Sequence, residues 1–428
     1  MSIKKEIPEL ITAGIISEEI AVKINEYYKN KDDSSSNRLF VVFGVLGAIL
    51  VGLGIILIIA HNWDELSRTS KTILSFIPLV IGQLLAGYTL LKKQNNLAWR
   101  ESSTAFLFFA VGASISLISQ IYNISGNLSD FLLTWMLLTL PLVYVMRSSV
   151  ASLLYIAGIS YYVFETGYSF HHNSTFNFYW ILLLLILPHY YMLYKNSPKS
   201  NYMTFHNWLL PLSVLLALGT FTNQNEKFMF VAYISLLGLF YLLGNTKFFS
   251  EQKLRNNSYK IIGTLGTLGI LLSLSFDWFW QELRDDAYIF EQFAYSSEFI
   301  VSVILTILAS ILLFYQMKGR NLKDLKPISI VFILFIIIFF IGMSFSISVI
   351  LINIIIFAIG ILTIREGAEQ NHLGILNYGL LIITSLIICR FFDIDLSFVL
   401  RGFMFITVGV GFFIANYWML KRRNNDEK

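Results

Sequence analysis

The sequence predicts an all-α fold: a polytopic bundle of about fourteen transmembrane helices behind a short cytosolic helical hairpin. Hydrophobic residues make up 56% of the 428 residues and charged residues only 14%, whereas about a quarter of the residues in soluble domains are charged. Apolar runs of about 20 residues, the length that a helix needs to cross a bilayer, recur along the chain. These runs are continuous and do not alternate with polar residues, so they favour helices over the strands of a barrel.

The N-terminal residues 1–38 are expected to form the hairpin and a linker. Gly14 interrupts the first helix, and Ser17 can cap a second helix that runs to Tyr27. Two short helices bury little apolar surface by themselves, so we expect residues 1–30 to contact a cytosolic partner or a second copy of the chain. A solvated amphipathic leader is the alternative.

The membrane domain is predicted over residues 39–420, and a basic cytosolic tail follows at 421–428. Among the spans, 149–165 and 206–222 carry the weakest apolar signal, and if either were re-entrant, every later loop would change sides. The predicted spans are 39–60, 72–92, 101–122, 131–146, 149–165, 177–194, 206–222, 228–245, 260–278, 297–316, 327–343, 345–364, 374–391 and 398–419.

The basic residues alternate between loops in a way that sets the orientation. With these spans, all but six of the 31 Lys and Arg residues lie on the same side as the N-terminus. Basic residues in short loops are retained in the cytoplasm, so both termini are expected to be cytoplasmic in a bacterial inner membrane. The net charge of +4 follows from this bias and is no argument for binding nucleic acid. The six exceptions are Arg68, Lys71, Lys227, Arg284, Arg390 and Arg401.

Small residues at helical spacing predict places where two helices pack closely, because they let helix backbones approach each other within a membrane. Residues 278–294 are instead expected to form an amphipathic helix that lies on the outer surface. The small residues are Gly44, Ala48 and Gly52 in the first span, and Gly263, Gly266 and Gly269 in the ninth.

Several stretches resemble a bacterial membrane protein family catalogued as domain of unknown function 2157. They are ELITAGIISEEIAVKINEYY in the leader, HNWDELSR after the first span, and WRESSTAF and SLISQIYNISGNLSD in and after the third. The resemblance covers residues 5 to 160, and residues 389–419, containing CRFFDIDLSFVLRGFMFITVG, are similar to the end of longer members and of a related family. It implies a polytopic bacterial inner-membrane protein and supplies neither an activity nor catalytic residues.

Polar residues gather at the ends of spans on the predicted outer side, where loops distant in sequence can converge on one cleft. Arg401 is the most unusual of them, because it lies several residues into a span and needs a partner such as Asp277, Asp393 or Asp395. A guanidinium suits a carboxylate or phosphate ligand. Helix capping, interface anchoring and ion pairing are the structural alternatives. The candidate ligand-binding residues are Asp64, Gln120, Tyr122, Asn123, Asp277, Arg390, Asp393, Asp395 and Arg401.

The sequence carries no motif for a catalytic, cofactor or metal site. There is no nucleotide-binding glycine loop and no serine-hydrolase elbow. His171 and His172 are adjacent and therefore do not share a helical face, and the single cysteine, Cys389, excludes a Cys-rich metal site. We therefore predict no catalytic residue, no cofactor and no bound metal.

Three functions are compatible with these features. We favour a carrier or flippase-like protein that handles a small polar or anionic solute or a lipid through the outer cleft, because fourteen spans exceed what anchoring requires. The first alternative is a non-catalytic scaffold or sensor that presents the hairpin to cytosolic partners. The second is an outer-facing enzyme on a lipid-linked substrate, with Asp64, Asp277 and Asp393 as carboxylates. Membrane lipids are expected partners in every case.

Overall fold

The computed structural model describes residue 7, residues 10–24, parts of 42–57, residues 66–168, 178–223, 226–285, 296–318 and 326–391, and parts of 397–417. Within these ranges every regular element is helical and there is no strand, which confirms the all-α fold. Each of the predicted spans contains helix in its described part. The chain divides into two compact units, Met1–His206 and Asn207–Lys428, which we describe in turn.

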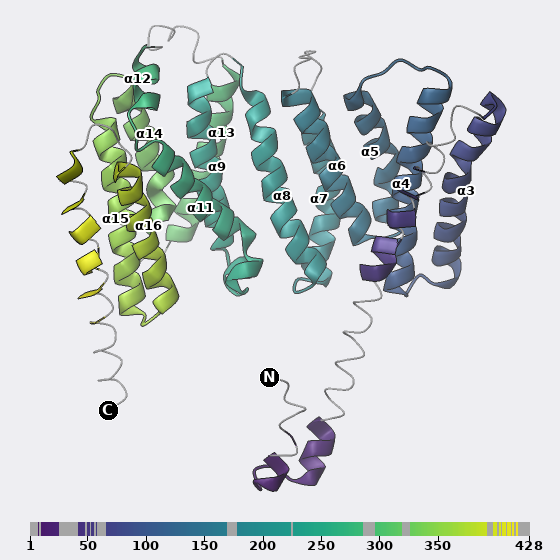
Figure 1. Cartoon of the computed structure of the whole chain (residues 1–428), viewed down its shortest axis with the longest axis horizontal. Coiled ribbons are helices and arrows are strands. Elements are labelled where there is room, and N and C mark those ends of the chain that lie inside the picture. The colour runs from purple at the N-terminus through teal and green to yellow at the C-terminus, as the bar shows by residue number, and fades with distance from the viewer. Residues whose placement is uncertain are drawn as a thin grey trace. The chain divides into compact units, whose positions relative to one another are not determined.

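The first unit is built from antiparallel helices that pack against their sequence neighbours (Figure 1). Side chains cap the first turns of the first three long helices: Ser67 accepts the N–H of Ser70, Asn96 that of Trp99, and Asn127 that of Asp130. These helices are α3 (Arg68–Lys92), α4 (Leu97–Ile121), α5 (Leu128–Val145), α6 (Ser149–Tyr168) and α7 (Tyr179–Asn196), followed by α8 (Asn201–Leu218), which continues into the second unit.

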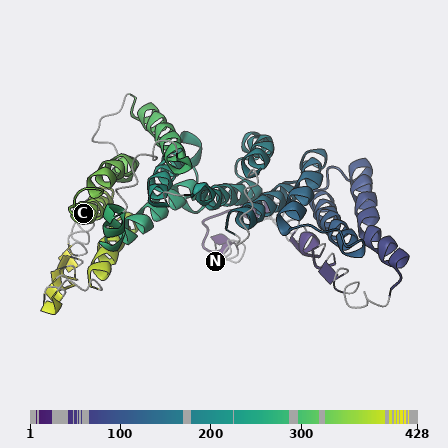
Figure 2. The ribbon, with the colours of Figure 1, turned by 90° about the horizontal axis from the view of Figure 1, so that it is seen from above.

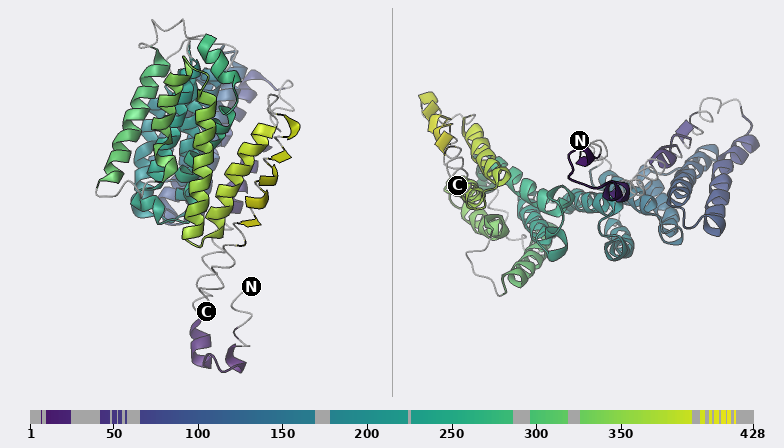
Figure 3. Two further views of the ribbon diagram at one scale, coloured as in Figure 1. Left: turned by 90° about the vertical axis from the view of Figure 1, so that its left-hand side faces the viewer. Right: turned by 90° about the horizontal axis from the view of Figure 1, so that it is seen from below.

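The second unit surrounds a core rich in aromatic side chains, in which α9 packs on α11, α13 and α14, and α15 packs on α16. Figure 2 looks down on these helices, and Figure 3 shows α15 and α16 side by side along their length. The elements are α9 (Met229–Gly244), α10 (Lys247–Ser250), α11 (Ser258–Ser273), α12 (Trp278–Asp285), α13 (Ser297–Met317), α14 (Val331–Gly342), α15 (Ser348–Glu369) and α16 (Leu373–Phe391), with short 3₁₀ turns at Gly219–Phe221, Glu226–Phe228, Leu254–Asn256 and Pro327–Ile330.

The long helices carry large apolar side chains on their outward faces. Leu84 is 68% exposed, Leu91 83% and Phe314 76%. Contiguous exposed apolar surface of this kind is typical of helices that face lipid. By length and composition, eight helices in the described residues can cross a membrane, or nine if α11 and α12 form one bent span. The multi-pass membrane fold is thus shown, whereas the predicted count of fourteen is not confirmed.

Of the two predicted spans with the weakest apolar signal, the structure supports one as a candidate span. The segment 206–222 overlaps Asn201–Phe221, which is long and apolar enough to span, whereas 149–165 lies in α6, which is not among the eight helices. Nevertheless, α6 has 20 residues, and at 1.5 Å per residue it is about 30 Å long, the thickness of the hydrocarbon core. Its serines and tyrosines lower its hydropathy, and several of them are buried against neighbouring helices.

Only two of the three glycines in the ninth predicted span contact a neighbouring helix among the described residues. A Cβ at Gly263 would lie 2.5 Å from the backbone nitrogen of Tyr241, and one at Gly266 would lie 2.5 Å from the side chain of Leu237, so α11 packs closely on α9 at both positions. Nothing lies within 4 Å of a Cβ at Gly269. In the first predicted span, Gly44 packs against α4, where a Cβ on this glycine would lie 2.6 Å from the Ser102 hydroxyl oxygen.

In its described part, Trp278–Asp285, the apolar face of α12 packs on protein, in contrast to the expectation for residues 278–294; residues 286–294 lie outside the described residues. Phe279, Trp280 and Leu283 are buried in the core of the second unit, and the Trp280 ring lies against Gly342 of α14. Its amphipathic pattern reflects burial against protein, which the sequence alone does not distinguish from burial in lipid.

The described N-terminal residues show two local features of the expected hairpin. Gly14 has a φ of 69°, in the left-handed region, and the backbone N–H of Ile20 donates to Ser17 Oγ at 3.4 Å. Residues 25–41 lie outside the described residues. The complete hairpin and its contact with a partner therefore stay predictions.

Candidate functional site

The candidate residues of the first unit lie at the C-terminal end of α4. The Tyr122 hydroxyl is 3.3 Å from the Thr72 hydroxyl, and the guanidinium of Arg68 lies 4.8 Å from the Tyr122 ring centroid. Tyr122 therefore ties the end of α4 to the start of α3. Asn123 has a φ of 50° and turns the chain after the helix, while Gln120 is exposed.

The candidate residues of the second unit gather at the break between α11 and α12. The two helices meet at an angle of 74°, and the break exposes backbone carbonyls that need donors. The indole of Trp280 donates to Leu274 O at 2.8 Å, and the amide of Asn353 on α15 donates to Ser275 O at 3.1 Å. Side chains from α12 and α15 thus donate hydrogen bonds to the backbone carbonyls at the break between the two helices.

Among the described residues, Arg390, Arg284 and Asp277 have charged side chains at this break. Arg390 of α16 donates to Ser275 Oγ at 3.2 Å, and its guanidinium lies 4.6 Å from the ring centroid of Phe276. Asp277 accepts from Arg284 at 3.3 Å and from Gln281 at 2.6 Å. Arg284 Nη1 is buried and has no hydrogen-bond partner among the described residues. Asp277 and Arg390 thus both lie at this break, and their role in binding a ligand stays a prediction.

Four predicted site residues, Asp64, Asp393, Asp395 and Arg401, lie outside the described residues. The expected pairs of Arg390 with Asp393 and of Arg401 with a carboxylate therefore stay predictions. A single outer cleft formed by all nine candidate residues also stays a prediction.

A buried polar cluster that the sequence did not reveal lies at the opposite end of α4. Glu101 is completely buried and accepts hydrogen bonds from the Ser148 hydroxyl and from the backbone N–H groups of Ser149 and Val150, at 3.3 and 2.9 Å. The carboxylate therefore caps the N-terminus of α6 from a neighbouring helix, where a negative charge also suits the helix dipole. Arg100 Nη2 lies 3.6 Å from the same carboxylate.

Two histidines extend this cluster between α6, α7 and α8. His206 Nδ1 is 2.7 Å from the carbonyl of Tyr202, so it carries the proton, and Nε2 then accepts from the Ser152 hydroxyl at 2.8 Å. The His189 ring lies 5.9 Å from that of His206, and its Nε2 is buried without a partner among the described residues. A glutamate, an arginine and two histidines in one helical unit are polar groups of the kind that membrane helices rarely bury.

The second unit also has a polar cluster at the end away from the break. Lys326 forms an ion pair with Glu366, and the Asn257 amide donates to Gly244 O at 2.8 Å and to Phe249 O at 3.1 Å. In Figure 1 α12 lies at the upper end of this unit, whereas the connection from α9 to α11, which contains α10, lies at the lower end. The sequence did not reveal this cluster, because contacts between residues far apart along the chain are not visible in one-dimensional spacing.

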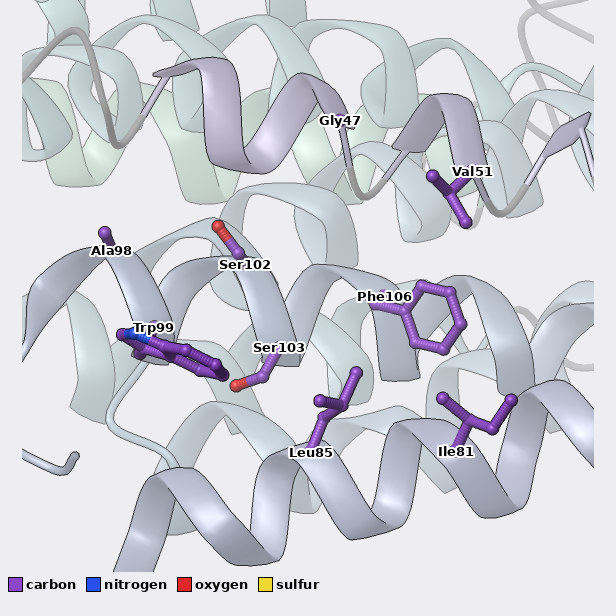
Figure 4. Close-up of a pocket in the computed structure, with 9 residues that line it drawn as sticks. All are labelled: Gly47, Val51, Ile81, Leu85, Ala98, Trp99, Ser102, Ser103 and Phe106. Carbon is purple, nitrogen blue, oxygen red and sulfur yellow. The ribbon is translucent and has the colours of Figure 1, made fainter. Parts of the chain in front are cut away.

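An apolar groove lies between the helix Val42–Val51, α3 and α4, with a volume of about 480 Å³. In Figure 4 Phe106, Val51 and Ile81 lie toward one end, Ala98 and Trp99 toward the other, and two serines between them. The Ser102 hydroxyl is buried and has no hydrogen-bond partner in the described part of the chain. The groove lining is Gly47, Val51, Ile81, Leu85, Ala98, Trp99, Ser102, Ser103 and Phe106.

The groove differs from the polar outer cleft that the sequence suggested. Ser102 and Gln120 are both on α4, 18 positions apart, which corresponds to about 27 Å along the helix axis. The groove therefore lies toward the other end of the helix from the predicted site residues. Among the described residues, no group of three His, Cys, Asp or Glu side chains could hold a metal ion.

Comparison with known proteins finds one matching family. Residues 8–152 match the family model described as "Predicted membrane protein (DUF2157)", which confirms the resemblance found in the sequence. The match includes α3, α4, α5 and the start of α6. No curated protein and no solved structure matches the chain. The family match and the apolar helices together identify a multi-pass membrane protein.

Proposed function

We propose that the protein is a membrane carrier of a small anionic solute, and that its cargo binds at the break between α11 and α12. One observation supports the proposal: two guanidinium groups lie at the break between α11 and α12, where Arg284 pairs with Asp277 and Arg390 donates to Ser275 Oγ. Discontinuous helices of this kind form the binding sites of many transporters, because they place polar groups within the membrane region.

The chemistry of the break favours an anion. The backbone carbonyls of Leu274 and Ser275 already accept hydrogen bonds from Trp280 and Asn353, so these carbonyls do not favour a cation. Arg284 Nη1 is buried and has no acceptor in the described residues, and a buried donor without an acceptor is unfavourable. A carboxylate or phosphate oxygen would supply that acceptor with the geometry that guanidinium groups prefer.

A carrier also fits the amount of membrane structure better than a scaffold does. One helix is enough to anchor a protein, and the described residues contain at least eight that are long and apolar enough to span. The additional helices form two units with buried polar clusters, which an anchor does not need.

The proposal is tested by binding and uptake of defined anions. Inorganic phosphate and succinate are added to the purified protein and to proteoliposomes, with the unfolding temperature and solute uptake as readouts. We expect at least one of these anions to stabilise the protein and to enter the proteoliposomes. Arg390→Gln should weaken binding about 10- to 100-fold, since a hydrogen bond to a charged group contributes about 1.5–3 kcal/mol.

The matched control is Arg365→Gln, which removes an exposed arginine that pairs with Glu369 on α15 and should leave binding unchanged. Arg390→Lys keeps the charge and loses the planar donor geometry, so it should bind with intermediate affinity. Equal anion binding by wild type and by a folded Arg390→Gln variant would contradict the proposal, as would the absence of uptake of both anions.

A further inference from the structure

We infer that the groove between Val42–Val51, α3 and α4 holds one acyl chain of an anionic phospholipid. This site is independent of the proposed anion site, because it lies in the first unit and uses different residues. Its volume of about 480 Å³ lies in the range of small-molecule pockets. Both α3 and α4 are candidate spans, so the medium around the groove is lipid hydrocarbon.

The lining of the groove matches an acyl chain followed by a polar linkage. Val51, Ile81, Leu85 and Phe106 supply an apolar wall, and Ser102 adds a buried hydroxyl without a partner in the described residues. The ester oxygens of a glycerolipid are acceptors that this hydroxyl can donate to. A free fatty chain or a detergent tail without such an acceptor would leave the hydroxyl unsatisfied.

Aromatic side chains mark the polar end of the groove as an interface. The rings of Trp99 and Tyr88 are in edge-to-face contact, with centroids 5.4 Å apart. Tryptophan and tyrosine are enriched where the hydrocarbon core meets the headgroups. The groove therefore begins at the headgroup level and extends into the hydrocarbon.

The charges beyond that end select an anionic headgroup. Lys92 closes α3 and Lys93 follows it, and both are exposed. Glu101 is the one acidic residue in the sequence from 66 to 129. It is completely buried and bonded to the start of α6, so it does not offset the lysines at the surface. Lysines placed next to a membrane attract anionic lipids.

The spacing along α3 fits a single phospholipid. Ile81 and Lys92 are 11 positions apart, or about 16 Å along the helix, which is close to the half-thickness of about 15 Å for a hydrocarbon core of roughly 30 Å. A headgroup at Lys92 thus places an acyl chain along Leu85 and Ile81.

The experiment uses the full chain in phosphatidylcholine vesicles that contain phosphatidylglycerol with a photoreactive acyl chain. We expect labelling of the groove helices, mapped by mass spectrometry, and competition by unlabelled phosphatidylglycerol but not by phosphatidylcholine. Leu85→Trp fills the groove and should reduce labelling several-fold. Leu84→Trp is the matched control, because Leu84 is the preceding residue on the same helix and faces outward with 68% of its surface exposed.

A double variant, Lys92→Gln with Lys93→Gln, tests recognition of the headgroup separately from binding of the acyl chain. It should remove the preference for phosphatidylglycerol while a photoreactive phosphatidylcholine still labels the groove. Equal labelling of Leu85→Trp and Leu84→Trp would overturn the acyl-chain site, and equal competition by both lipids would overturn the anionic headgroup. Protein–protein cross-links at Leu85 in place of lipid labels would overturn the lipid site and assign the groove to a second copy of the chain.

Discussion

Single residues show how this chain buries charge within helices that are otherwise apolar. Glu101 has no exposed surface, and its oxygens accept from the Ser148 hydroxyl and from two backbone N–H groups at the start of α6. The carboxylate thereby replaces the side-chain cap that a helix usually takes from its own sequence. Its position near the start of α4 gives no hint of this role, because its partners are 47 to 49 positions away.

Replacing Glu101 tests whether this contact stabilises the first unit. Glu101→Ala leaves the hydroxyl and two N–H groups buried without an acceptor, so we expect the free energy of unfolding to fall by about 1–3 kcal/mol. Glu101→Gln keeps an acceptor and should lose less. Chemical denaturation in detergent measures the change, and the exposed Glu369→Gln on α15 serves as the control. A loss for Glu101→Ala no larger than that for Glu369→Gln would show that the cap is dispensable.

At the scale of elements, small residues decide how closely helices approach. Three glycines of α11 share one sequence pattern, yet only Gly263 and Gly266 contact α9. Their spacing predicts a close contact without saying which glycine reaches the neighbour. That depends on the crossing point of the two helices, which long-range packing sets.

The glycine pair Gly263 and Gly269 gives a matched test on one helix. Gly263→Ala places a Cβ within 2.5 to 2.9 Å of the α9 backbone, so the helices must separate, and overpacking of this kind costs about 1–3 kcal/mol. Gly269→Ala meets open space and should be neutral or stabilising by about 0.5–1 kcal/mol, since alanine favours helix more than glycine does. Unfolding transitions of the two variants in the same detergent check this; equal stability would place the α9–α11 contact elsewhere.

At the scale of the whole molecule, the distribution of basic residues predicts on which side each loop lies. The segment α6 is the decisive case, because it is long enough to span but less apolar than the eight candidate spans. If it crosses, Arg147 before it and Ser174 after it lie on opposite sides of the membrane.

Cysteine labelling in a Cys389→Ser background tests this topology in intact cells. We expect a membrane-impermeant maleimide to label Ser174→Cys from outside and Arg147→Cys only after permeabilisation. Ser125→Cys and Ser250→Cys provide outer and inner references under the predicted orientation. Labelling of Arg147→Cys and Ser174→Cys from the same side would remove α6 from the spans and would reduce the predicted count.

The sequence by itself determined the all-α membrane fold and the family resemblance. These follow from local properties: the length of apolar runs and short motifs. The tertiary structure alone decided that Glu101 caps α6, that Trp280 is buried in protein, and that an apolar groove opens beside Ser102. Each of these depends on partners from other helices, and the side on which a helix meets a neighbour is not encoded in its own residues.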